Sequence, residues 1–171
     1  MKRRLEVLQK IPIFKDVTPE TLTRLGEIAR PINFKKGDII IKEGEAGSCM
    51  FILVDGSVKI TKNITLSATE PNSEGIEKDL IMLSGEDLPV FGEMSLLEED
   101  VRTATVTALA DVELWRIDKD DFREAAEKDY KSAYFVVLEI ARIISSRLRK
   151  TDRDIVKLTT VLGIALSRDR G

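Results

Sequence analysis

Seven of the ten glycines in this sequence fall between Gly37 and Gly92, where they separate short runs of β-forming residues. The segments EGEAGSC (43–49) and DGS (55–57) have the composition of turns. Short strands joined by glycine turns are typical of antiparallel sandwiches and barrels. We therefore predict strands at residues 39–42, 50–54, 57–61, 80–83, 103–108 and 113–117. The polar stretch 63–79, NITLSATEPNSEGIEKD, predicts a long hairpin loop.

Helical patterns precede this β region. In TPETLTRLGEIA, residues 18–29, Thr18 suits the N-cap, Pro19 suits the first helical position, and apolar residues follow at helical spacing. A shorter apolar pattern predicts another helix that ends at Pro12.

A long helix is predicted after the strands. Asp118 can cap a helix through residues 120–128, and a second helix runs from about residue 132 to about residue 166. In that second helix an apolar seam keeps heptad spacing for more than four heptads, as in a coiled coil. The seam comprises Tyr134, Val137, Ala141, Ile144, Leu148, Thr151, Ile155, Leu158, Leu162 and Ala165. We expect its first turns to pack on the β domain and the rest to pack against a partner helix, giving a homodimer.

These patterns predict an α+β, mainly β, fold: an antiparallel β-sandwich or jelly roll flanked by N-terminal helices and a long C-terminal dimerisation helix. The expected division is a β domain over residues 1–130 and a dimerisation helix over residues 131–171.

Composition excludes several classes of function. The chain has no histidine, which removes Ser-His-Asp and Cys-His catalysis and the commonest zinc ligand. Its acidic residues are not grouped for metal binding, so we expect neither an enzyme nor a metal site. The net charge is −3, and the basic N-terminus MKRRLEVLQK lacks the apolar stretch of a signal peptide. With a single cysteine, Cys49, and no apolar run long enough to span a bilayer, we expect a cytoplasmic protein with no membrane partner.

The segment FGEMSLLEEDVRTATV, residues 91–106, carries the chemistry. An ionised Glu93 accepts hydrogen bonds and suits a sugar hydroxyl, while Arg102 offers planar charged donors that suit phosphate. Gly92 permits a close backbone approach, and one helical turn at 93–97 can present amides to an anion. The alternative is that Glu93 and Arg102 pair with each other on a surface turn.

This segment resembles the phosphate-binding cassette of cyclic-nucleotide-binding domains, F-G-E-(L/M)-(A/S)-L-L followed by P-R-(A/S/T)-A-(T/S)-V. Residues 35–60 and 104–122 also resemble the family's strands, and the resemblance extends from about residue 10 to about residue 150.

The resemblance implies a role for each matching residue. Glu93 would accept a hydrogen bond from the ribose 2′-hydroxyl, and Arg102 would pair with the exocyclic oxygens of the cyclic phosphate. Backbone amides would complete the anion site. The implied ligand-binding residues are Gly92, Glu93, Met94, Ser95, Arg102, Thr103 and Ala104.

The sequence departs from the family pattern at two places. Val101 replaces the usual proline before Arg102, which puts affinity in question. In regulators of the catabolite-activator type, a threonine–serine pair on the long helix contacts the base, and here Thr151 and Asp152 align with it. Thr151 is thus a further candidate ligand residue or a tolerated polar seam position. Thr103 resembles the threonine that favours cGMP in cGMP-dependent kinases, or it serves strand propensity; the sequence favours cAMP over cGMP only as the common bacterial ligand.

The expected function is a stand-alone cyclic-nucleotide sensor that signals to an unknown effector protein through its dimer helix, with no prosthetic group. The alternative is a degenerate fold that acts only as a dimerisation and interaction module. Because the sequence ends after the long helix, without a recognition helix, we expect no DNA binding by this chain alone.

Overall fold

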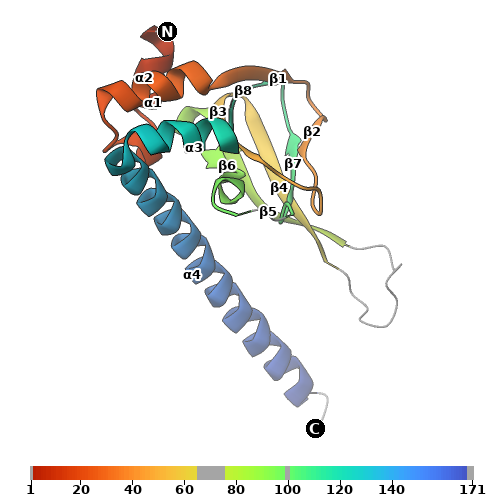
Figure 1. Cartoon of the computed structure of the whole chain (residues 1–171). Coiled ribbons are helices and arrows are strands. Elements are labelled where there is room, and N and C mark those ends of the chain that lie inside the picture. The colour runs from red at the N-terminus through yellow and green to blue at the C-terminus, as the bar shows by residue number, and fades with distance from the viewer. Residues whose placement is uncertain (1, 65–75, 99–100, 169–171) are drawn as a thin grey trace.

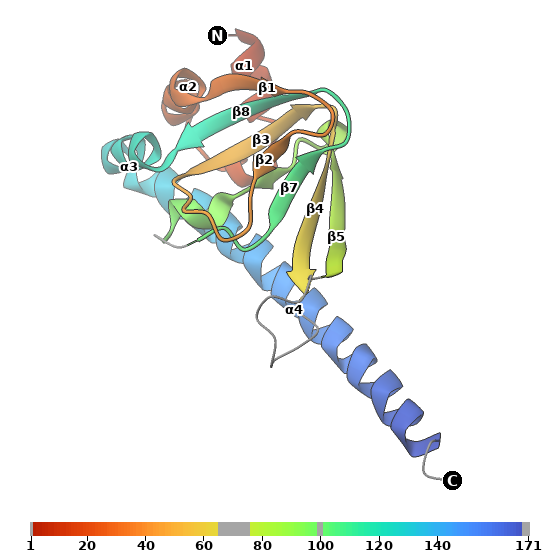
Figure 2. The same ribbon diagram turned by 90° about the vertical axis from the view of Figure 1, so that its right-hand side faces the viewer.

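The computed structural model describes residues 2–64, 76–98 and 101–168. Two antiparallel sheets lie face to face, with helices gathered on the outer side of one of them (Figures 1 and 2). The helices are α1 (Lys2–Leu8), α2 (Pro19–Ile28), α3 (Lys119–Lys128) and α4 (Tyr130–Arg168), with 3₁₀ turns η1 (Pro12–Phe14), η2 (Gly85–Asp87) and η3 (Glu93–Leu96). The strands are β1 (Arg30–Phe34), β2 (Ile39–Ile41), β3 (Cys49–Asp55), β4 (Ser57–Ile64), β5 (Ile76–Ser84), β6 (Val90–Phe91), β7 (Thr105–Ala108) and β8 (Val112–Asp118).

The first sheet, in the order β1-β8-β3-β6, forms the middle layer of the molecule. Successive side chains of a strand point to opposite faces, and in β3 both faces are buried. Met50 and Ile52 belong to a core shared with the helices, whereas Phe51 and Leu53 belong to a core shared with the second sheet, β2-β7-β4-β5. The predicted sandwich with flanking helices is therefore confirmed.

Most of the predicted elements are present with small shifts. Thr18 caps α2 by accepting a hydrogen bond from the Thr21 amide. The predicted loop 63–79 was too wide, because β4 continues to Ile64 and β5 begins at Ile76; residues 65–75 of that loop lie outside the described residues. Pro12 begins η1 instead of directly ending α1, which stops at Leu8.

The face of helix α4 that packs on the β domain is not the face that the heptad seam predicted. Ser132, Val136 and Ile140 are buried against the core, whereas Tyr134 of the seam is 62% exposed. The prediction that the first seam residues pack on the domain is therefore wrong for Tyr134 and Val137. The buried stripe and the seam meet at Ile144, which packs partly against the core.

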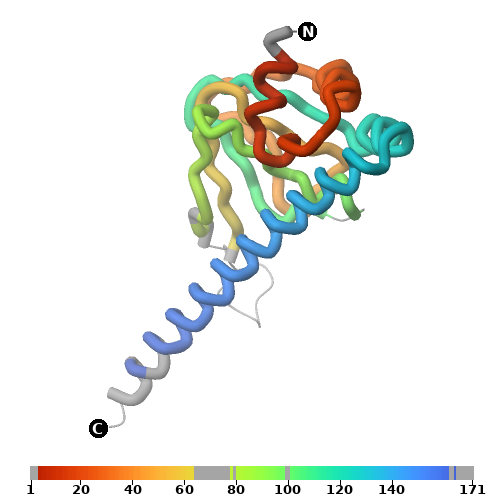
Figure 3. Tube along the Cα trace, turned by 90° about the vertical axis from the view of Figure 1, so that its left-hand side faces the viewer, coloured from red at the N-terminus to blue at the C-terminus, as the bar shows by residue number. Residues whose placement is uncertain are grey.

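The C-terminal part of α4 projects away from the sandwich (Figure 3), and the described side chains beyond Arg147 are exposed, including Leu148 at 60% and Ile155 at 55%. The division into residues 1–130 and 131–171 stays a prediction.

The start of α4 is fixed to α2 by hydrogen bonds around Asp129. Its Oδ2 accepts from the hydroxyls of Thr18 at 2.9 Å, Thr21 at 2.7 Å and Ser132 at 2.6 Å. These bonds, from Ser132 first, hold the pKa of Asp129 well below its usual range. The N-terminal end of α4 is thus anchored, in contrast to its outer half.

Candidate functional site

A cavity of about 80 Å³, partly open to solvent, lies between η3, the segment before β7, and α4. Of the candidate residues, Gly92, Glu93, Met94, Ser95, Arg102, Thr103 and Ala104 line it. The structure thus brings together seven side chains or backbone segments that the sequence singled out.

Glu93 is the first residue of η3 and is fully buried. Gly92, its N-cap, has φ of 71°, the left-handed conformation in which glycine is not strained. One carboxylate oxygen of Glu93, Oε1, accepts a hydrogen bond from Nη1 of Arg147 at 2.5 Å. The other, Oε2, is buried and has no hydrogen-bond partner among the described residues. An unsatisfied buried acceptor is costly, so this oxygen is poised to receive a donor.

Arg102 is 9% exposed, and its guanidinium is held by neutral acceptors. Nη1 donates to the Ser95 hydroxyl at 2.7 Å and to the Gly92 carbonyl at 3.3 Å. Nη2 donates to the carbonyl of Cys49 at 2.8 Å and to its sulfur at 3.3 Å. The backbone is fixed as well, because the Arg102 amide donates to the carbonyl of Glu45 at 2.8 Å. The guanidinium is therefore oriented but has no carboxylate partner within the described residues.

Glu93 and Arg102 do not pair with each other. Each is buried and has its own partners, so the alternative of a mutual ion pair on a surface turn is wrong. Between them lies a cavity whose walls carry a negative and a positive charge at separate positions.

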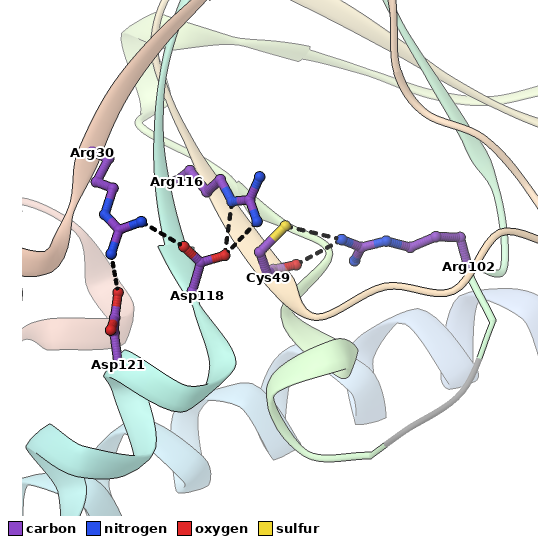
Figure 4. A network of polar contacts seen from close by, with 6 residues as sticks. All are labelled: Arg30, Cys49, Arg102, Arg116, Asp118 and Asp121. Atoms are coloured by element: carbon purple, nitrogen blue, oxygen red, sulfur yellow. Dashed lines mark hydrogen bonds and ion pairs between the residues drawn. The ribbon is translucent and has the colours of Figure 1, made fainter.

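A row of charged residues leads away from the Arg102 side of this cavity (Figure 4). Arg116 donates to Oδ1 of Asp118, and Arg30 bridges Asp118 and Asp121. The hydrogen bond to Asp118 raises the pKa of Arg116.

Thr151 stands apart from the other candidates. It is exposed on α4, and its hydroxyl donates to the carbonyl of Arg147 on its own helix, at 3.1 Å. The structure of a single chain does not place it in the cavity.

Sequence reasoning did not identify Arg147. Its side chain is half exposed and reaches the buried carboxylate of Glu93. No local pattern identifies it, because its role depends on how α4 crosses the β domain. The cavity also includes two apolar residues outside the motif, Ile41 and Ile60, and the apolar residues at its two ends, Phe91 and Val106.

The structure also bears on membrane insertion and on metal binding. No helix among the described residues has both the length and the apolarity needed to cross a bilayer. Within the same residues, no three potential metal ligands of the histidine, cysteine or acidic type cluster together.

Comparison with known proteins identifies the family. The family model "Cyclic nucleotide-binding domain" matches residues 31–129. A CRP-like cAMP-activated global transcriptional regulator of Mycobacterium tuberculosis is 27% identical over 90% of this chain and 62% of its own length. The cGMP-dependent protein kinase, isozyme 1, of Drosophila melanogaster is 30% identical over 76% of this chain but only 17% of its own length.

Among solved structures, the Thermus thermophilus catabolite activator protein superposes with a TM-score of 0.70 and 25% identity, covering 86% of this chain and 63% of that one. The chain thus spans less than two thirds of the length of each of these three proteins. Because the family model covers more than half of the chain, the protein belongs to the cyclic nucleotide-binding domain family.

Proposed function

We propose that this protein binds a cyclic nucleotide in the cavity between Glu93 and Arg102 and acts as a regulatory sensor rather than an enzyme. The observation that carries the proposal is the buried Oε2 of Glu93, which has no partner among the described residues and lies in the wall of a cavity that also contains Arg102. A ribose hydroxyl would supply the missing donor.

The phosphate would bind at the Nη1 side of Arg102. Its oxygens would take the places of the neutral acceptors on Nη1, the Ser95 hydroxyl and the Gly92 carbonyl. The backbone amides of Thr103 and Ala104, which donate to no protein acceptor within the described residues, would add donors from the other side. Thr151 would reach the base only from a second copy of the chain.

We favour cAMP over cGMP. The mycobacterial relative is named as cAMP-activated, and it covers more of this chain than the cGMP-dependent kinase does. Thr103 lines the cavity and is the residue that would favour guanine, so both nucleotides belong in the test.

Calorimetric titration of the native protein with cAMP and cGMP tests the proposal. Glu93→Gln and Arg102→Ala should each abolish the binding heat, whereas Glu27→Gln and Arg153→Ala, matched changes at exposed positions, should leave it intact. At a hundredfold excess over Kd, the ligand should stabilise the native fold by about 2.7 kcal/mol. Absence of heat and of stabilisation with either nucleotide would contradict ligand binding.

That negative result would favour a ligand-free interaction module. One observation is consistent with it: the charge of Glu93 is already partly compensated by Arg147. A pure module would lose nothing in partner binding when Arg102 is replaced, so the two functions are separable.

We further propose that two chains pair through the exposed apolar seam of α4, and that the nucleotide changes the position of this helix. A ligand shifts such an equilibrium only through different affinities for the two arrangements. The Glu93–Arg147 pair provides the difference, because it joins the cavity directly to α4. Light scattering should show a dimer that Ile155→Glu dissociates, and a monomeric native protein would refute the pairing. An unidentified effector protein and a cytoplasmic location complete the proposal.

A further inference from the structure

We propose that Cys49 is a positioning residue for Arg102, and that its side chain must be an uncharged hydrogen-bond acceptor. The inference rests on the proposed function, since the effect is to leave the charge of Arg102 available to the phosphate of a ligand.

Cys49 holds one end of the guanidinium. Its carbonyl and its sulfur both accept from the same nitrogen, Nη2, at 2.8 and 3.3 Å. Cys49 is 6% exposed and opens β3, where it is paired in register with Asp118 of β8. Since both atoms belong to a residue fixed in the middle sheet, Nη2 is anchored while Nη1 faces η3 and the cavity.

The charges around Cys49 alternate in sign and then stop (Figure 4). Asp121 pairs with Arg30 at 2.7 Å, Arg30 with Asp118 at 3.4 Å, and Asp118 with Arg116 at 2.5 Å. The next position along this row, between Arg116 and Arg102, is occupied by the thiol of Cys49. An acid there would complete the alternation and give Arg102 an internal counter-ion.

The absence of that counter-ion matters for binding. Opposite charges in contact attract strongly at the reduced effective dielectric of a protein, so a carboxylate at position 49 would compete strongly with a phosphate. A thiol is a weak neutral acceptor, which orients the guanidinium without compensating it. Within the described residues every partner of Arg102 is neutral, so its positive charge is oriented but not compensated.

The isosteric pair Cys49→Asn and Cys49→Asp tests the proposal in the full chain, with cAMP as the titrant. Cys49→Ser and Cys49→Asn, which keep a neutral acceptor, should bind within about threefold of the native protein, whereas Cys49→Asp should bind at least about tenfold more weakly. Asn33→Asp, the same isosteric change on the exposed face of β1, controls for net charge and should bind normally. Equal affinity of Cys49→Asp and Cys49→Asn would overturn the proposal, as would a Cys49→Asp protein that fails to fold while Cys49→Asn folds.

A second measurement does not depend on the nucleotide. The carboxyl pKa of the introduced side chain in Cys49→Asp, followed by carbon NMR, should lie below the ordinary aspartate value of about 3.9, because Arg102 stabilises the charged form. Adding Arg102→Met should raise it. A carboxyl that titrates at or above about 3.9 with Arg102 present would refute an uncompensated guanidinium at this position. If the native protein binds no nucleotide, the proposed function fails, and the NMR titration still decides the electrostatic claim.

Discussion

Replacing Arg147 with alanine should destabilise the folded protein, because it leaves the carboxylate of Glu93 buried without its counter-charge. Glu93 is 1% exposed at the side chain and Arg147 is 50% exposed. Removing one partner of a fully buried pair costs about 3–5 kcal/mol. Since water already reaches Arg147 and can partly replace it, we expect about 2 kcal/mol, within the range of about 1.5–3 kcal/mol for a hydrogen bond to a charged group.

Urea unfolding followed by tryptophan fluorescence measures this cost. The single tryptophan, Trp115, is buried in the core and reports loss of the sandwich. With a denaturant slope of about 2 kcal/mol per M, a loss of about 2 kcal/mol lowers the midpoint by about 1 M. Arg153→Ala, an exposed arginine on the same helix, should change stability by less than about 0.5 kcal/mol.

A double-mutant cycle isolates the ion pair. In a Glu93→Gln background the buried charge is absent, so Arg147→Ala should then cost at least about 1 kcal/mol less than in the native background. Equal costs in both backgrounds, or a native-background cost no larger than that of Arg153→Ala, would show that Arg147 does not neutralise Glu93.

Three further outcomes are expected, one from the anchor of α4 and two from the glycines. Because the pKa of Asp129 is depressed in the folded state, its contribution to stability is complete above about pH 4 and is lost as the pH falls through its folded-state pKa. Asp129→Asn should therefore make the urea midpoint depend less on pH at the acid end of a series measured from pH 2 to 7. Parallel pH profiles of the variant and the native protein would contradict this. Gly47→Ala should weaken cAMP binding at least about tenfold by calorimetry, because a Cβ there would lie 2.2 Å from Nε of Arg102. Gly37→Ala, at φ of 93° with no atom within 4 Å of the added carbon, should cost about 1 kcal/mol of stability and leave binding unchanged; a reversal of these two effects would refute the steric argument.

Local sequence patterns were sufficient for the strands that glycine turns delimit. Gly44 and Gly56 adopt φ of 84° and 83°, so the turns predicted around them depend on residues that permit that conformation. By contrast, β1 begins with RPINF, which has no strong strand pattern, and it is a strand because it pairs along β8 from Arg30 to Phe34. Strand β6 has only two residues and is defined by its partners in β3. Pairing between distant segments leaves no local pattern.

The site residues also divide into those that a local sequence pattern predicted and one that it did not. Glu93 and Arg102 were predicted because both belong to one short motif whose chemistry is specific. Arg147 lies more than fifty residues after Glu93 and reaches it only because α4 crosses the cavity. The seam was assigned to the wrong face near Tyr134 for a similar reason: a heptad count identifies an apolar stripe but not which neighbour covers it.

The uneven support of α4 has a consequence for local opening. Up to Ile144 its amides are held by tertiary packing and by the Asp129 anchor. Beyond Arg147 the described side chains are exposed, and those of Thr151, Arg153, Thr159 and Thr160 form hydrogen bonds within the helix. Amide hydrogen exchange should therefore be slow in the first turns of α4 and fast in its outer turns. Protection of those outer turns would rise only when another surface covers them. Amide exchange rates along α4 therefore report whether another surface is bound to its outer half.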